Sequence, residues 1–107
     1  MRREALKGHL DLLLLSILEA GPAHGYAVIA ALRERSGGDF DLPEGTVYPA
    51  LHRLEDAGLL ASRWSDGAPR RRRVYRLTPR GRSELDRAGR EWRRFAHAVD
   101  AVVGGTS

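Results

Sequence analysis

The sequence predicts a mainly α-helical fold with one small β-hairpin. Three observations predict it: apolar residues recur at helical spacing in three segments of the first half, two short alternating segments follow, and the C-terminal segment carries a heptad pattern. A chain of 107 residues suits one hydrophobic core rather than two. It contains no cysteine, which excludes disulfides, cysteine-ligated zinc and a cysteine nucleophile. The fold must therefore depend on packing or on association.

The first predicted helix spans residues 4–20 and ends at Gly21–Pro22. Its apolar residues recur every three or four positions: Leu6, Leu10, Leu13, Leu14, Ile17 and Leu18. Leu12 and Leu15 widen this face, so we expect the helix to be covered on two sides. The apolar run is far shorter than the roughly 20 residues of a membrane span, and it lacks a signal-peptide cleavage site. We therefore expect a cytoplasmic protein with no membrane partner.

Two further helices are predicted over residues 23–36 and 44–57, separated by a stretch rich in turn-forming residues. The inner face of the later helix follows from the 100° step between helical residues: Val47, Ala50, Leu51 and Leu54. Pro49 lies close enough to the start of this helix for its missing amide to remove only one hydrogen bond. Gly58 then ends the helix.

The segments 59–65 and 71–77 alternate in polarity and are joined by turn-forming residues, which predicts a β-hairpin. Thr78–Pro79 is typical of a helix start, because threonine caps the helix and proline fits its first turn. The last helix runs towards Val103, and its apolar residues have heptad spacing: Leu85, Ala88, Trp92, Phe95, Val99 and Val102. A lone helix would expose this seam to water, so we expect these residues to form a homodimer.

The basic charge is concentrated in one region. Residues 63–94 contain twelve arginines and four acidic residues, whereas the rest of the chain has more acidic than basic residues. An unbroken arginine run from Arg70 to Arg73 lies at the predicted hairpin tip. Such a patch favours a polyanionic partner, and arginine suits bidentate phosphate contacts. A solvated face, or a GC-rich genome, would produce the same composition.

Three helices followed by a hairpin with a basic tip is the order of a winged helix-turn-helix, whose third helix enters the major groove of DNA. We expect residues 1–77 to form this DNA-binding domain and residues 78–107 to form the dimerisation helix, in one compact unit. The expected partner is double-stranded DNA with an inverted repeat, because a two-fold dimer presents the same helix twice. The candidate DNA-binding residues lie on the third helix and the hairpin tip: Thr46, Tyr48, Pro49, His52, Arg53, Arg70, Arg71, Arg72 and Arg73.

The motif His24-Gly25-Tyr26 begins the second helix. Glycine allows another element to approach closely, and tyrosine at such a position usually packs in the interior. We therefore interpret this motif as structural.

Five motifs occur in a specific order along nearly the whole chain: LSIL at 15–18, GPAHGY at 21–26, GTVYPALHRLE at 45–55, GLL at 58–60 and RRRVYRLTPRG at 71–81. Their order and spacing resemble the PadR family of bacterial transcriptional regulators, and the single C-terminal helix resembles the shorter PadR subfamily. Glu44 and the arginine-rich wing depart from the family pattern, which bears on the DNA sequence preference. The resemblance implies a dimeric repressor of its own or an adjacent operon, released by a small-molecule effector.

Trp92 is also a candidate effector-binding residue. Tryptophan is bulky for a two-helix seam, so Trp92 and its two-fold copy would leave a gap that suits a planar aromatic molecule. The gap would also be lined by Phe95, Ala88, Leu12 and Leu15. The resemblance supports this, because similar short PadR regulators take flat aromatic drugs between paired tryptophans. In the alternative interpretation, Trp92 only packs against its symmetry mate.

Other classes of function have weaker support. An enzyme is not predicted, because the histidines are scattered and neither a glycine-rich phosphate loop nor a nucleophile elbow is present. No cofactor is expected. A basic RNA-binding domain is one alternative, although it would lack the usual exposed aromatic sheet. A metal-responsive regulator of the same fold is another, with ligands drawn from His9, His97, Glu4, Asp11 and Asp100.

Overall fold

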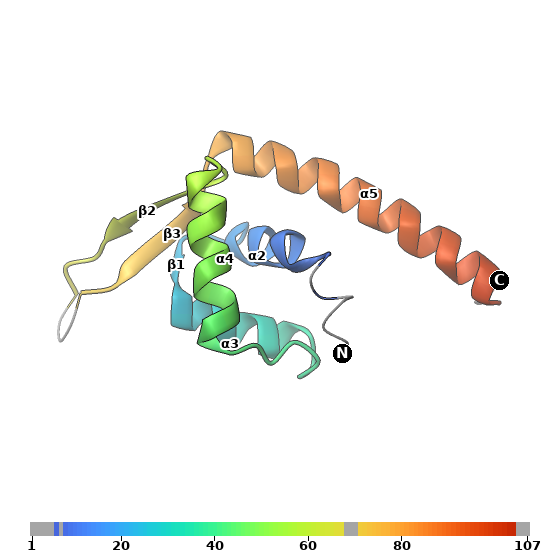
Figure 1. The fold of residues 1–107 in the computed structure, drawn as a ribbon, viewed down its shortest axis with the longest axis horizontal. Helices are drawn as coiled ribbons and strands as arrows, with labels where there is room; N and C mark the ends of the chain where they lie inside the picture. The colour runs from blue at the N-terminus through green and yellow to red at the C-terminus, as the bar shows by residue number, and fades with distance from the viewer. Residues whose placement is uncertain (1–5, 7, 68–70, 105–107) are drawn as a thin grey trace.

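The computed structural model describes residues 6, 8–67 and 71–104. Its elements are α2 (Leu10–Leu18), β1 (Ala23–His24), α3 (Gly25–Arg35), α4 (Glu44–Asp56), β2 (Leu60–Trp64), β3 (Arg73–Leu77) and α5 (Pro79–Val103). Helices α2, α3 and α4 form one body, from which the β2–β3 hairpin and the long helix α5 extend in different directions (Figure 1). The predicted class, mainly helical with a small hairpin and a long C-terminal helix, is confirmed.

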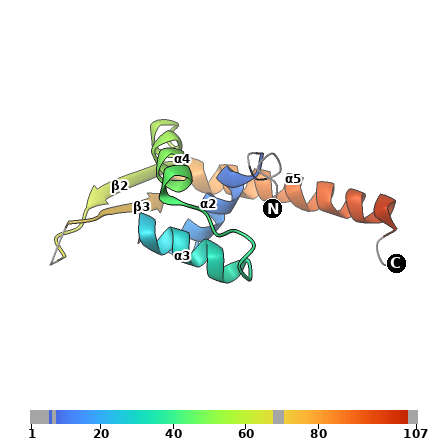
Figure 2. The same cartoon turned by 60° about the horizontal axis from the view of Figure 1, so that its bottom comes forward.

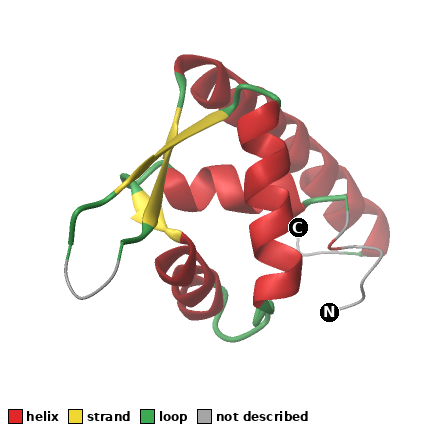
Figure 3. Cartoon of the chain, turned by 60° about the vertical axis from the view of Figure 1, so that its left-hand side comes forward, coloured by secondary structure: helices red, strands yellow, loops and turns green. Residues whose placement is uncertain are grey.

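Helix α2 lies at the centre of the body and contacts α3, α4, α5 and β3 (Figure 3). Leu14 and Leu15 are both buried, so the expectation that this helix is covered on two sides is confirmed. The helix is shorter than predicted, because Gly8 and His9 form a turn and the helix begins at Leu10. Glycine is a poor helix former, and the His9 backbone, with φ −129° and ψ 0°, is not helical. Residues 4, 5 and 7 of the predicted helix lie outside the described residues.

The sheet has three strands in the order β1-β3-β2, all antiparallel, rather than the two that the sequence predicts. The additional strand β1 pairs Ala23 with Tyr75 and His24 with Val74. Its two residues are too few to show an alternating pattern, which is why the sequence does not reveal it. The pairing matters for function because it fixes His24 against β3.

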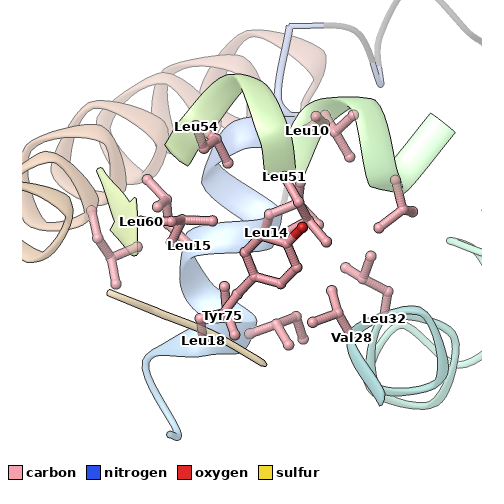
Figure 4. Packing of buried hydrophobic residues seen from close by; sticks show 14 residues of the cluster. Leu10, Leu14, Leu15, Leu18, Val28, Leu32, Leu51, Leu54, Leu60 and Tyr75 are labelled. Carbon is pink, nitrogen blue, oxygen red and sulfur yellow. The ribbon is translucent and has the colours of Figure 1, made fainter. Parts of the chain in front are cut away.

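The core is formed where α2, α3 and α4 meet the sheet (Figure 4). The predicted inner face of α4 is confirmed, since its four apolar residues are all buried: Val47, Ala50, Leu51 and Leu54. Pro49 lies within α4 without ending it. The aromatic ring of Tyr75 is fully buried among these leucines. The opposite face of α4 is therefore left for solvent or a partner.

Helix α5 begins as predicted, because the Thr78 hydroxyl accepts a hydrogen bond from the Gly81 amide at 3.0 Å. Its 25 residues give a length of about 37 Å. Leu85 is buried against the body, whereas Trp92, Phe95, Val99 and Val102 remain exposed in the single chain. Figure 2 shows the far end of α5 and the β2–β3 hairpin at opposite ends of the molecule. Within the described ranges, no helix is long and apolar enough to cross a bilayer.

Candidate nucleic-acid interface

The polar face of α4 and the β2–β3 hairpin enclose a cavity of about 300 Å³, which we call the α4–wing cavity. Basic and aromatic side chains dominate its lining: His24, Gly25, Tyr26, Tyr48, His52, Trp64, Arg71, Arg72, Arg73 and Tyr75. Five of the predicted DNA-binding residues are thus brought together by elements that are distant in sequence. On the same helix, Pro49 is exposed and Thr46 is partly exposed.

Tyr48 links α4 to the start of α3. Its ring lies directly against Gly25, where a Cβ atom would overlap the ring, so the predicted close approach at this glycine is confirmed. Burial, together with the neighbouring Tyr26 and Glu44, raises the pKa of Tyr48, so its hydroxyl stays protonated and can donate a hydrogen bond at neutral pH. Tyr26 packs edge-on against Tyr48 with ring centroids 6.1 Å apart.

Tyr26 packs against Tyr48, but it does so at the surface rather than in the interior, since the residue is 52% exposed. Tyr26 lies in the first turn of α3, next to the cavity rather than over the core, which is covered instead by Val28 and Leu32. The exposed ring therefore enlarges the aromatic rim of the α4–wing cavity.

His24 caps α3 and also contacts the hairpin. Its Nδ1 accepts a hydrogen bond from the Ala27 amide at 3.2 Å, which is the role of an N-cap residue. Its Nε2 lies 2.9 Å from Nη1 of Arg72. The sequence predicts the structural role of His24 at the start of α3. It does not predict the contact with Arg72, because that contact depends on the pairing of β1 with β3.

The three described arginines of the hairpin tip have different surroundings. Arg73 donates through Nε to the Ser62 hydroxyl at 2.8 Å, and Ser62 in turn donates to Glu55 at 2.6 Å. Arg73 also lies 3.6 Å from Glu55, so this network ties β2 and β3 to the C-terminal turn of α4. Arg72 is exposed. Arg70 lies outside the described residues.

Trp64 is an exposed interface residue that the sequence analysis does not identify. The guanidinium groups of Arg71 and Arg73 lie 5.2 Å and 5.3 Å from the centre of its ring, which is cation–π geometry. The hairpin register pairs Trp64 with Arg73, so a correct alignment of the two predicted strands is the signal that could reveal this contact.

Arg53 has a partner on another helix. Its two terminal nitrogens donate to both carboxylate oxygens of Asp11 at 3.0 Å and 2.8 Å. This hydrogen bonding raises the pKa of Arg53 above its ordinary value. The bidentate pair joins α4 to α2, and both side chains are about half exposed, so its net contribution to stability is small, about 0–1 kcal/mol.

The candidate effector residues lie at the other side of the molecule, between α2 and α5. Two cavities of about 500 Å³ and 410 Å³ adjoin Trp92, and Leu12 lines both. Ala88 and Phe95 line the smaller one. Leu15 does not line the cavities as the sequence predicts, because it is buried in the core.

The imidazole ring of His9 packs edge-on against Trp92 at 4.9 Å. Among the described residues, no group of three or more histidine, aspartate or glutamate side chains is placed to hold a metal ion. Of the ligands considered for a metal site, Glu4 lies outside the described residues. The two cavities beside Trp92 are lined by a mixture of aromatic, apolar and charged residues.

Several known proteins similar to this chain are regulators of transcription. Residues 14–87 match the model of the transcriptional regulator PadR-like family. The transcriptional regulator Rv3488 of Mycobacterium tuberculosis is 43% identical over 75 residues, which cover 70% of this chain and 67% of that protein.

Solved structures agree with this assignment. A PadR family transcription regulator from Clostridium difficile superposes with a TM-score of 0.77 at 37% identity, covering 91% of this chain and 99% of that one. Bacillus subtilis PadR, crystallised in complex with operator DNA, superposes with a TM-score of 0.65 at 28% identity, covering 72% of this chain and 44% of that one.

The family match includes α3, α4, both hairpin strands and the start of α5, which together form the winged helix-turn-helix described above. The proteins of this family regulate transcription and are not enzymes, in agreement with the sequence prediction. The chain therefore belongs to the PadR-like family of DNA-binding transcriptional regulators.

Proposed function

We propose that the chain is a homodimeric repressor that binds an inverted repeat in double-stranded DNA and is released by a planar aromatic effector. The observation that carries the DNA-binding part is the α4–wing cavity, where the polar face of α4 meets three arginines of the hairpin. In this proposal residues 1–77 contact DNA and residues 78–107 hold the dimer together. Repression itself rests on the family resemblance.

The proposed contacts with DNA differ between α4 and the hairpin. We assign base-edge contacts in the major groove to Thr46, Tyr48, Pro49 and His52, because they occupy the face of α4 opposite the core. Arg70, Arg71 and Arg72 are assigned to the phosphate backbone or the minor groove. Arg53 and Arg73 are paired with Asp11 and Glu55, so we propose that they position α4 and the hairpin and do not contact DNA.

The proposed function predicts a palindromic target. Selection from a random pool of duplexes should recover inverted repeats whose half-sites are about 34 Å apart, because the dimer presents two copies of α4. Binding should weaken by about 10³–10⁵-fold between 50 and 200 mM salt if the dimer neutralises roughly 6–10 phosphates. Fluorescence anisotropy at several salt concentrations measures this. Equal affinity for single-stranded RNA and duplex DNA would contradict the proposal and favour the RNA alternative.

Two variants separate the roles of the two elements. His52→Ala should reduce discrimination between the selected duplex and random DNA, by about 1–3 kcal/mol, because it removes a base contact. Arg72→Ala should weaken both complexes alike and lower the slope of log affinity against log salt by about one for each phosphate that is no longer neutralised. If His52→Ala leaves discrimination unchanged, α4 does not read bases through this residue.

The effector proposal rests on the position of Trp92 between two cavities in the α2–α5 region. A planar cationic dye should quench tryptophan emission and dissociate the DNA complex, provided that it binds the free and DNA-bound dimers with different affinity. Trp92→Ala should abolish the quenching, whereas Trp64→Ala serves as the matched control because Trp64 lies in the hairpin. Quenching that persists in Trp92→Ala and disappears in Trp64→Ala would place the dye at the hairpin.

A further inference from the structure

The ring of His24 is placed between two hydrogen-bond donors. The Ala27 amide lies 3.2 Å from Nδ1, and Nη1 of Arg72 lies 2.9 Å from Nε2. A neutral imidazole has one protonated and one accepting nitrogen, so it cannot accept both hydrogen bonds. Whichever tautomer forms, one of the two contacts brings two donors together.

The contact that must yield is the one with Arg72. The Ala27 amide is fixed by the backbone of α3 and belongs to the first turn, whose amides have no intrahelical acceptor. Arg72 is exposed and has a long side chain that can move at little cost. The ring therefore keeps Nδ1 as acceptor and carries its proton on Nε2. In this tautomer the imidazole N–H and the Arg72 guanidinium are both hydrogen-bond donors in the lining of the α4–wing cavity.

A buried hydroxyl in the lining of the same cavity is also without an acceptor. Tyr75 is fully buried, and the residues that the structure describes offer its hydroxyl a nearby donor, Arg73, but no acceptor for its proton. Burial raises the pKa of Tyr75, so the hydroxyl keeps its proton at neutral pH. A buried hydroxyl whose proton has no acceptor is costly.

The start of α3 adds positive potential to these donors. The Tyr48 hydroxyl lies against Gly25 in the first turn of this 11-residue helix, where the helix dipole favours an anion. Of the carboxylates near these groups, Glu55 of α4 is already paired with Arg73 and Ser62, whereas Glu44 lies near Tyr48. The cavity therefore presents side-chain donors of three kinds, imidazole, guanidinium and phenol, at the positive end of a helix.

We infer that the α4–wing cavity binds a backbone phosphate of the DNA duplex, with His24 Nε2 and Arg72 as its donors and the Tyr75 hydroxyl behind them. This inference rests on the proposed function and deepens it. It adds a contact with DNA to the structural role of His24. The phosphate would contact both the start of α3 and the hairpin. This contact would fix the position of α4 along the adjacent groove.

His24→Asn tests the inference with the helix cap preserved. Asparagine caps helices well through its side-chain oxygen but has no group at the position of Nε2. We expect this variant to fold, as judged by circular dichroism, and to bind operator and random duplexes about tenfold or more weakly. Because the removed donor is uncharged, the salt dependence should stay as in the wild type, whereas Arg72→Gln should lower it. Unchanged DNA affinity of a folded His24→Asn protein would overturn the inference.

Substituted DNA locates the phosphate. A neutral methylphosphonate can replace each backbone phosphate of the operator, one position at a time. At one position we expect the wild type and His24→Asn to bind with equal affinity, because the modified DNA can no longer accept a hydrogen bond from His24 in either protein. If the defect of His24→Asn persists in full at every position, no backbone phosphate meets His24. If the wild type binds no duplex at all, the proposed function fails, whereas normal wild-type binding with an unaffected variant removes only the phosphate assignment.

Imidazole ¹⁵N NMR tests the tautomer independently of affinity. We expect the proton of His24 on Nε2 in the free protein and a shift of that nitrogen when DNA is added. A proton on Nδ1 would overturn the inference, since the ring would then accept from Arg72. Inorganic phosphate is the control for binding of a free anion. If millimolar phosphate shifts the ¹⁵N resonance of Nε2 as much as DNA does, and His24→Asn binds DNA normally, the cavity binds a free anion instead of a backbone phosphate.

Discussion

Replacing Val99 with glutamate should convert the proposed dimer into monomers that no longer bind operator DNA. Val99 lies in the C-terminal half of the seam of α5, and in the single chain Val99 and the neighbouring Trp92 and Phe95 are 39%, 41% and 57% exposed. Two-fold symmetry places the introduced carboxylate at the interface twice. Burying an unpaired charge costs several kcal/mol, so a total near 4 kcal/mol raises the dimer dissociation constant by about a thousandfold.

Sedimentation equilibrium across a range of protein concentrations measures this change. Arg90→Glu is the matched control, because it introduces the same side chain at an exposed position of α5 that lies across the helix from Trp92. We expect Arg90→Glu to remain a dimer. A wild-type protein that is monomeric at micromolar concentration would remove the basis for the seam, and with it the expected spacing of the two half-sites.

The elements that could be predicted from sequence are those whose signals are local. The period of α4, the alternation of the hairpin strands and the Thr78–Pro79 start of α5 each depend on neighbours within a few residues, and the structure confirms all three. The break at Gly8 escapes such a prediction because the apolar period continues through it from Leu6 to Leu10. Periodicity reports which face is buried, and it does not report where the backbone leaves the helix.

The parts of the site that could not be predicted depend on contacts between distant residues. Arg53 and Asp11 are 42 positions apart, and Arg72 and His24 are 48 apart. Composition identifies such arginines as basic and exposed but cannot tell a paired guanidinium from one that is available to DNA. The sequence therefore indicates one candidate surface, α4 with the hairpin tip, whose residues the structure brings together, while the roles of individual arginines within it require the tertiary structure.

Gly81→Ala should be strongly destabilising, although the substitution adds only one methyl group in a helix. A Cβ at this position would collide with the backbone carbonyl of Leu59, which cannot rotate away as a side chain could. That carbonyl accepts a hydrogen bond from the Thr78 amide at 3.1 Å, and the Thr78 hydroxyl donates to the Gly58 carbonyl at 2.7 Å. Moving α5 outward to relieve the collision would stretch these bonds, so we expect a loss of about 3 kcal/mol in the free energy of unfolding.

Gly45→Ala is the control, because Gly45 also lies in the first turn of a helix but a Cβ there meets no atom within 4 Å. Alanine at Gly45 should stabilise the protein by about 0.5–1 kcal/mol. Urea denaturation at fixed protein concentration compares the two variants, and equal stability of Gly81→Ala and the wild type would show that the junction between the hairpin and α5 yields easily. A rigid junction matters for the proposed dimer. In that dimer the angle at which α5 leaves the hairpin would set the distance between the two copies of α4, and therefore the half-site spacing that the protein can recognise.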